Sequence, residues 1–365
     1  MKYGFTTGSC AAAASKASLY MLLTGEDIKT VSVNTPGGIE FTTEILDIKR
    51  GDGYVSCAVK KDGGDDPDIT TGLYIYSKVS LYECKGVKIT GGEGVGKVTK
   101  PGLDQPVGEY AINSVPRKMI ISEIESVLDE LDYDAGVRVE ISVPEGKEIA
   151  EKTFNPKLGI EGGISIIGTS GIVEPMSTKA VLDTIKTFLD QRHALGYDYV
   201  AISPGNYGLE FMKKTYGYDL DKSVKCSNFI GASAKMALEA GFKQVLYTGH
   251  IGKMIKVAGG IMNTHSREAD CRMEILSALS IRHYIDPDTV RNILDCVTTE
   301  EAVKLIEETG KLKEVMNDAV ERICKKLMEH TGNKIQIECI IFSNEMGELG
   351  SSKGAGELIQ KLSEE

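Results

Sequence analysis

The stretch VLYTGHIGK, residues 245–253, joins a short apolar strand to a helix through a glycine loop. The same order recurs at residues 199–208, where YVAIS precedes PGNYG, and at residues 163–171, where GISII precedes GTSG. Strands that alternate with glycine loops and helices are typical of a mostly parallel sheet covered by helices. We therefore expect residues 151–365 to form an α/β, Rossmann-like domain with a helical C-terminal region.

The N-terminal half shows a different pattern. Two helices are expected, one from the threonine-rich segment 6–9 to Gly25 and one from Pro116 to Leu131. Strands in runs with few helices predict an α+β domain over residues 1–150, with mixed strands and glycine-rich loops. Alternating apolar residues place the strands at 31–33, 41–48, 54–59, 73–81 and 137–143.

Composition excludes several classes of protein. The 365 residues include 42 Lys and Arg against 53 Asp and Glu, for a net charge of −11. This acidic balance argues against nucleic acid and anionic membranes as partners. The 8 cysteines contain no CxxC pair, which is typical of reduced thiols in a cytoplasmic protein, and no apolar run approaches the length of a membrane span. The 40 glycines, with no Trp, suggest loops whose backbone approaches a ligand closely.

The loops that follow the three predicted strands are expected to meet at one sheet edge, where α/β folds bind ligands. His250 lies in one of these loops, and His265 lies in the polar run NTHSR that opens another predicted helix. No histidine or cysteine pattern indicates a zinc site. We expect the loops to form a crevice lined by backbone N–H groups, with Gly168, Thr169, Gly205, Asn206 and Gly249.

Three N-terminal segments leave alternatives open. Residues 91–97 match the G-x4-G-K part of a phosphate loop, but Val98 replaces the metal-binding hydroxyl, so nucleotide hydrolysis is rejected. The segment is then either a carboxylate-binding loop or a plain hairpin loop. The acidic run 60–68 is either a ligand site, with Asp65 and Asp66, or a solvated turn. The helix start with Thr7 and Ser9 suits an anion, or is simply a capped, buried helix.

Taken together, several segments resemble the cobalt-precorrin-5B C1-methyltransferase family of anaerobic cobalamin biosynthesis. The resemblance covers residues 3–275 and includes the runs GFTTGSCAA, GHIGK and NTHSREADCR. Several separate motifs in the same order are far more specific than any single glycine pattern. The segments that carry the resemblance are 4–12, 61–68, 91–103, 111–120, 153–177 and 249–272.

The resemblance implies methyl transfer from S-adenosylmethionine to C1 of cobalt-precorrin-5B, which gives cobalt-precorrin-6A. The glycine-lined C-terminal crevice is then the expected site of S-adenosylmethionine, and cobalt enters only as part of the substrate. A polycarboxylate macrocycle calls for basic side chains. If a base takes part, His250 is the first candidate and Asp65 or Asp66 the next. The expected substrate-binding residues are Thr7, Ser9, Lys97, Lys100, Arg117, Lys253, His265 and Arg267.

Two other functions stay open at this stage. A non-catalytic tetrapyrrole carrier would need the same carboxylate-binding loops. An NAD(P)-dependent oxidoreductase fits less well, because no G-x-G-x-x-G turn opens a helix. Assembly into a homo-oligomer is left open. The acidic excess is expected on outer helices, among them 300–308, and a positive island is expected around Lys97, Arg117 and Lys253.

Overall fold

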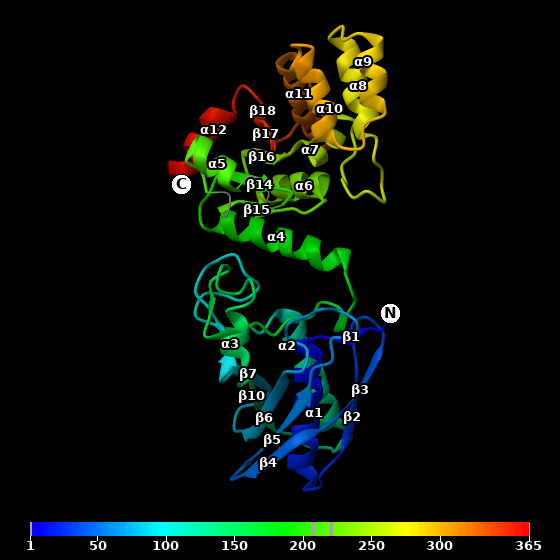
Figure 1. The fold of residues 1–365 in the computed structure, drawn as a ribbon. Coiled ribbons are helices and arrows are strands. Elements are labelled where there is room, and N and C mark those ends of the chain that lie inside the picture. The colour runs from blue at the N-terminus through cyan, green and yellow to red at the C-terminus, as the bar shows by residue number, and fades with distance from the viewer. Residues whose placement is uncertain (1, 206–208, 220–221, 365) are drawn as a thin grey trace. The chain divides into compact units, whose positions relative to one another are not determined.

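The computed structural model describes residues 2–205, 209–219 and 222–364. The chain forms two compact units, Met1–Thr178 and Lys179–Glu365, each with mixed α and β structure (Figure 1). The division falls later than the predicted boundary near residue 150. The reason is strand pairing, because the short strands that follow residue 150 pair with strands of the first unit.

A five-stranded sheet of order β4-β5-β6-β10-β7 forms the first unit's framework. Its pairings are antiparallel except for β10 with β7, which is parallel. The strands predicted at 54–59, 73–81 and 137–143 are confirmed as β5, β6 and β10, whereas the predicted strand 41–48 is divided between a hairpin strand, Glu40–Glu44, and β4. The strands are β4 (Leu46–Gly51), β5 (Tyr54–Lys60), β6 (Tyr74–Tyr82), β7 (Val87–Gly91) and β10 (Gly136–Ser142).

Helix α1 (Thr7–Thr24) lies against this sheet and beside α2 (Ser114–Glu130) (Figure 1). Its alanines at 11–14 are fully buried, and such small side chains let the helix approach the strands closely. Two buried serines then reach the sheet: Ser15 Oγ lies 2.8 Å from Ser77 Oγ, and Ser18 Oγ donates to the Ser77 carbonyl. Gly25 ends the helix in the left-handed conformation, as predicted.

Short elements complete the first unit. A β2–β3 hairpin covers α1, and three two-residue pairings join segments that are distant in sequence: β1 with β13, β9 with β11, and β8 with β12. The elements are β1 (Gly4–Phe5), β2 (Thr30–Asn34), β3 (Glu40–Glu44), β8 (Gly94–Val95), β9 (Lys97–Val98), α3 (Gly146–Ala150), β11 (Ile160–Glu161), β12 (Gly163–Ile164) and β13 (Ile172–Val173).

The second unit contains a five-stranded sheet of order β15-β14-β16-β17-β18. Its first three pairings are parallel and the last, β17 with β18, is antiparallel. The sheet is therefore of mixed orientation, with four strands running in one direction. The strands are β14 (Tyr199–Ser203), β15 (Val224–Lys225), β16 (Gln244–His250), β17 (Gln336–Ser343) and β18 (Gly347–Ser351).

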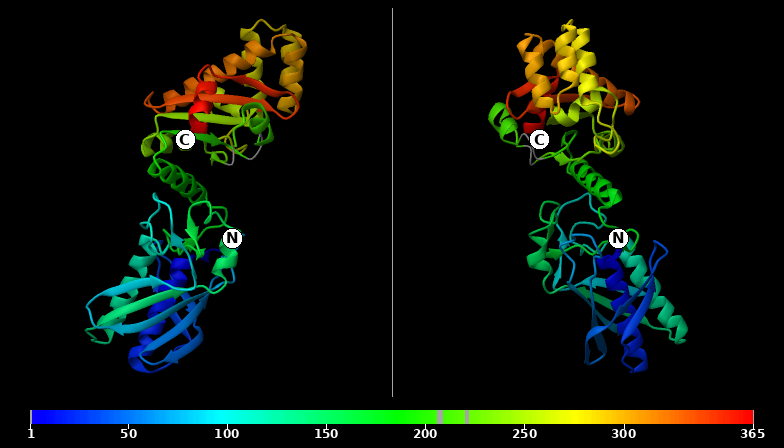
Figure 2. Two further views of the ribbon diagram at one scale, coloured as in Figure 1. Left: turned by 90° about the vertical axis from the view of Figure 1, so that its left-hand side faces the viewer. Right: turned by 45° about the vertical axis from the view of Figure 1, so that its right-hand side comes forward.

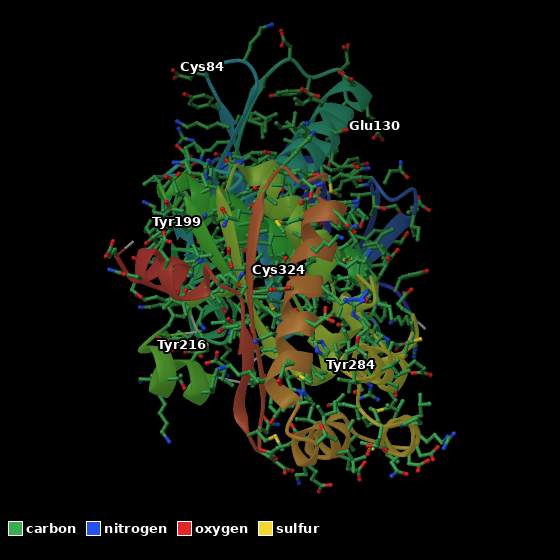
Figure 3. The ribbon with its side chains drawn as sticks, turned by 90° about the horizontal axis from the view of Figure 1, so that it is seen from above. Cys84, Glu130, Tyr199, Tyr216, Tyr284 and Cys324 are labelled. Atoms are coloured by element: carbon green, nitrogen blue, oxygen red, sulfur yellow. The ribbon has the colours of Figure 1, made fainter. Side chains whose placement is uncertain are left out.

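Helices cover both faces of this sheet, and α11, which carries Cys324, runs beside β17 (Figures 2 and 3). Alternate residues face the two layers: Val245 and Tyr247 pack with α6, α7 and α11, whereas Leu246 packs with α12. The helices are α4 (Thr178–Ala194), α5 (Leu209–Tyr216), α6 (Ile230–Ala240), α7 (Ile251–Ala258), α8 (Arg272–Arg282), α9 (Pro287–Leu294), α10 (Thr299–Glu308), α11 (Leu312–His330) and α12 (Ala355–Glu364).

One predicted strand lies elsewhere. Residues 163–167 were expected in the parallel sheet, but β12 pairs with β8 of the first unit. Ile164 and Ile166 are buried in the first unit's core, which explains the apolar run. The prediction of a third strand–loop–helix unit is therefore wrong. Within the described residues, no helix has both the length and the apolar character that a membrane span requires.

Candidate functional site

The second unit has a cleft of about 370 Å³ at the carboxyl ends of β14 and β16. Of the strands in this sheet, β14 comes first along the chain. The next strand, β15, pairs with one side of β14, and the following strand, β16, pairs with its other side. The strand order therefore reverses between β14 and β16, and open α/β sheets bind ligands at such a switch point. The cleft is lined by Ser203, Pro204, Gly205, Gly249, His250, Gly252, Lys253, Arg272, Thr299 and Asn344.

His250 is held by hydrogen bonds at both ring nitrogens. Its Nδ1 accepts from the Gly252 N–H at 3.1 Å and so caps α7. Since Nδ1 is an acceptor, the neutral ring carries its proton on Nε2, which donates to Glu300 Oε1 at 3.0 Å. Neither nitrogen has a free lone pair in this arrangement. The geometry therefore favours a positioning role over the predicted role as base.

Glu300 itself was expected on a solvated outer helix, and that expectation is wrong. The side chain is only 20% exposed, and its Oε1 also accepts from the Asn344 N–H. Its Oε2 is buried and has no hydrogen-bond partner among the described residues. The sequence of the acidic run 300–308 does not indicate that Glu300 binds His250, because a partly buried glutamate cannot be distinguished from its exposed neighbours by sequence.

Lys253 ties together two loops at the cleft. Its Nζ donates to the Pro204 carbonyl at 2.9 Å and lies 3.4 Å from the Ser227 carbonyl. Pro204 follows β14, and Ser227 follows β15. Burial, with a smaller contribution from the nearby Lys256, lowers the pKa of Lys253 below its usual range. A half-buried cation thus lies between the carboxyl ends of adjacent strands.

A second cleft, of about 320 Å³, adjoins the first. The two share Gly252, Lys253 and Arg272. His265 lines this second cleft, and its Nδ1 accepts from the Arg267 N–H at 3.1 Å. The exposed Arg267 is not among the lining residues, which are Asn228, Gly252, Lys253, Lys256, Thr264, His265, Ser266, Asp270 and Arg272.

Comparison with known proteins identifies the family. The family model CbiD matches residues 1–175, and the model described as "CbiD, C-terminal domain" matches residues 263–353. The chain belongs to the CbiD family. Both clefts lie in the second unit. The C-terminal family model covers helices α8 to α11 and strands β17 and β18 of this unit.

Relatives of this CbiD chain match over nearly its whole length. A cobalt-precorrin-5B C(1)-methyltransferase of Thermoanaerobacter sp. (strain X514) is 47% identical over 361 residues, 99% of this chain and 97% of the relative. One of Methanocaldococcus jannaschii is 43% identical, with 96% of each chain covered. A crystal structure of a cobalamin biosynthesis protein (cbiD) from Archaeoglobus fulgidus is 28% identical, with a TM-score of 0.38, and covers 73% of this chain and 82% of that one.

The structure of the CbiD chain brings together only some of the residues of the predicted glycine crevice. Gly205 and Gly249 line the first cleft. Gly168 and Thr169 do not, because their loop belongs to the first unit. There Gly168 lies so close to Thr6 that an added Cβ would be 2.2 Å from its Oγ1. Asn206 lies outside the described residues.

Thr7 and Ser9 use their hydroxyls inside the first unit. Thr7 Oγ1 accepts from the Ile167 N–H at 2.9 Å, and Ser9 Oγ donates to the Gly171 carbonyl at 2.7 Å. Both side chains are buried. These contacts tie the 167–171 loop to the start of α1, which fits the alternative of a capped, buried helix.

The three other N-terminal basic residues occupy different surroundings. Lys97 Nζ lies 4.9 Å from the centre of the Tyr110 ring, and the half-buried Lys100 lies near the Lys157 carbonyl. Arg117 donates to the Ile112 carbonyl, and its Nη2 is buried without a partner in the described chain. These residues lie in the first unit and Lys253 in the second, so the expected positive island is divided between two units.

Backbone N–H groups of the glycine loop at 91–97 donate hydrogen bonds to carbonyls of the protein itself. Gly92 N–H donates to the Ile141 carbonyl at 2.8 Å, and Gly96 N–H donates to the Ile164 carbonyl at 2.9 Å. Strands β8 and β9 also form within this segment. The segment is therefore an internal junction of small sheets, closer to the plain-loop alternative than to a carboxylate cradle.

The acidic loop 60–68 is held in place by an ion pair and by hydrogen bonds to its own carboxylates. Lys61 is almost fully buried, and its Nζ lies 2.6 Å from Asp68. Asp65 accepts from the Lys2 backbone N–H, and Asp66 accepts from that of Met176. Within the described residues, no group of three or more His, Cys, Asp or Glu has the arrangement of a metal site. The two predicted bases thus bind backbone groups of the first unit.

The Lys61–Asp68 pair gives the first unit an acid-sensitive contact. Burial raises the pKa of Asp68, but hydrogen bonds from Lys61 and Thr70 outweigh it, so the pKa is lowered overall. A lowered carboxyl pKa stabilises the fold above the unfolded-state value of about 3.9, and that contribution is lost as the pH falls through the folded-state value. Asp68→Asn should therefore lower the free energy of unfolding of the first unit at neutral pH. It should also make that free energy fall less steeply below about pH 4.

Urea denaturation of the full chain across this pH range, followed by hydrogen exchange of first-unit peptides, measures the effect. Asp134→Asn, which removes an exposed carboxylate of the same unit, is the control. An acid profile for Asp68→Asn that parallels the profile of the unmodified protein would show that this pair does not set acid stability.

Proposed function

We propose that this chain is an S-adenosylmethionine-dependent methyltransferase that methylates C1 of cobalt-precorrin-5B to give cobalt-precorrin-6A. The observation that carries the proposal is the match, over nearly the full length, to relatives that bear this activity in their names. The identities of 43–47% extend over both units, so the proposal applies to the whole chain.

We place the methyl donor in the cleft between β14 and β16, and infer that the second unit is Rossmann-like. The support is the switch point of the sheet and the bare backbone at Gly205 and Gly249. An added Cβ at Gly249 would lie 2.7 Å from Met254 Cγ and 3.0 Å from Pro204 Cγ. A side chain there would therefore push apart the loops that line the cleft.

The protein's main task in this reaction is positioning. S-adenosylmethionine supplies an electrophilic methyl group, so little covalent chemistry is required of the chain, and most of the rate comes from holding the reactants close and aligned. Lys253 fixes the loops after β14 and β15. His250, anchored by Glu300, caps α7 and lines the cleft.

The remaining site residues are part of the same proposal. Lys253, His265 and Arg267 are proposed to contact carboxylates of the macrocycle, since Lys253 and His265 line the second cleft and Arg267 follows His265 by two residues. For Lys97, Lys100 and Arg117, and for Asp65 or Asp66 as a base, the support is the sequence resemblance. A cytoplasmic location is supported by the wide spacing of the cysteines.

His250 variants separate positioning from base catalysis. Asn is a good N-cap residue, so His250→Asn should keep the start of α7 and retain kcat/KM within about threefold. His250→Ala loses the cap, which costs about 1 kcal/mol, and should lower kcat/KM roughly tenfold through a looser cleft. Single-turnover methylation across pH measures both. A base role predicts instead that both variants lose the same large factor and the acidic limb of the pH–rate profile.

The function itself is tested by calorimetry and mass spectrometry. The full chain is titrated with S-adenosylmethionine and S-adenosylhomocysteine, and then incubated with S-adenosylmethionine and cobalt-precorrin-5B. We expect both nucleosides to bind and the macrocycle to gain one methyl group. Absence of binding together with an unchanged macrocycle mass would overturn the proposal.

A further inference from the structure

The second cleft holds more positive than negative charge. Three cations line it, Lys253, Lys256 and Arg272, against a single carboxylate, Asp270. Lys256 is only 4% exposed. The protein as a whole is strongly acidic, so this local excess of positive charge runs against its composition.

The single carboxylate is already engaged. Arg272 donates to both oxygens of Asp270, through Nε at 2.5 Å and Nη2 at 2.9 Å. Lys256 Nζ is 3.8 Å from Asp270 Oδ1 and instead donates to the carbonyls of Thr264 and Ala269. Lys253 also donates only to carbonyls in the contacts described above. Lys256 thus has only a long ion pair with an Asp270 that already binds Arg272, and no ion pair of Lys253 is found among the described residues, which is costly for desolvated ammonium groups.

A further polar group lacks a partner at the same place. Thr264 is 4% exposed and lines the cleft, and its Oγ1 has no hydrogen-bond partner among the described residues. Gly252, in the first turn of the eight-residue helix α7, also lines the cleft. A buried hydroxyl donor, two ammonium groups and the positive end of a helix together match the requirements of a bound anion.

We propose that the second cleft is a subsite for a peripheral carboxylate of the tetrapyrrole substrate, with Lys253, Lys256 and Thr264 as donors and Arg272 at its entrance. This inference rests on the proposed function. The excess of cations over carboxylates in this cleft repels positively charged groups. A polycarboxylate is attracted instead. Because both clefts share Lys253 and Arg272, a carboxylate bound here brings the macrocycle edge to the donor cleft.

Lys256→Met and Arg272→Gln test the subsite. Met keeps the length of the buried stem without the charge, and Arg272 is partly exposed, so at least one variant should fold. Lys334→Gln, which removes an exposed cation of the same unit outside both clefts, is the matched control. Thermal unfolding of each full-length variant verifies the fold. Two probes are titrated: uroporphyrin, a tetrapyrrole with acetate and propionate on every ring, and S-adenosylhomocysteine.

We expect each cleft variant to bind uroporphyrin roughly ten- to a hundredfold more weakly. Lys256→Met should keep its S-adenosylhomocysteine affinity within about twofold, because Lys256 lines only the second cleft. The control should match the unmodified protein for both probes. Unchanged uroporphyrin affinity in folded Lys256→Met and Arg272→Gln would overturn the subsite. A loss confined to S-adenosylhomocysteine would assign the carboxylate to the donor and also overturn it. Failure of the unmodified protein to bind S-adenosylhomocysteine and to methylate cobalt-precorrin-5B is a different result, and it would reject the proposed function.

Discussion

Gly94→Ala should destabilise the first unit by on the order of 4 kcal/mol, because the new methyl group would overlap backbone atoms of a neighbouring segment. A Cβ at Gly94 would lie 1.7 Å from the Val143 carbonyl oxygen, a backbone atom that cannot rotate away. The residue also has a φ of 70°, in the left-handed region that favours glycine. Both the space and the backbone conformation therefore require glycine here.

The crowding at Gly94 involves two other glycines. An added Cβ at either Gly146 or Gly163 would lie 2.1 Å from the Gly94 carbonyl oxygen. Through this contact β8 meets both β12 and the start of α3. Relief of the clash would separate the segment 91–98 from the segment 160–164 and so disrupt the small sheets next to the main sheet.

The measurement is urea denaturation with hydrogen exchange resolved by peptide, so that the second unit of the same molecule is an internal reference. Gly108→Ala is the matched control, because Gly108 has a φ of 93° but open space around its Cα. It should cost only about 1–2 kcal/mol. Equal losses for the two variants would show that backbone conformation, and not the close approach to Val143, limits this site.

Lys253→Met should lower kcat/KM about a hundredfold or more while the protein stays folded. The variant removes the hydrogen bond to the Pro204 carbonyl that fixes the loop after β14. It also removes the one cation shared by both clefts whose Nζ makes no ion pair within the described chain. Loss of the fixed loop and loss of the attraction for substrate carboxylates both slow the same step, methyl transfer.

Steady-state and single-turnover methylation measure the effect, and Lys235→Met, on an exposed position of α6, is the control. Lys253→Arg keeps the charge but changes the geometry of the donor, so it should recover substrate affinity better than kcat. A kcat/KM for Lys253→Met within about threefold of the unmodified protein would remove Lys253 from the site.

Local patterns predicted most elements that are long and strongly periodic. Strand β14 was placed at its observed bounds, and helices α1 and α2 were placed to within about two residues. The short run at 163–167 was misplaced, because a few apolar residues before a glycine loop suit any buried segment. Ile164 and Ile166 do enter a core, but it is the core of the first unit.

The candidate site was predicted unevenly for a related reason. The glycines after β14 and β16, with His250 and Lys253, follow strands directly, so the general rule for α/β sheets pointed to them. Glu300 and Arg272 come from segments 50 and 22 positions beyond His250. Arg272 reaches the clefts because α8 packs beside α7, and Glu300 reaches the His250 ring because α10 packs against α8 and α11. Nothing in their local sequence distinguishes them from solvated charges.

The sequence by itself determined the family and the glycine loops after β14 and β16, because these depend on residues that are close together in the chain. Only the tertiary structure decided the strand order β15-β14-β16-β17-β18, and with it the position of the switch point. It also decided that an acidic chain gathers Lys253, Lys256 and Arg272 around one cleft. The physical reason is that strand order and charge clustering arise from packing between distant segments, whose energies no local pattern records.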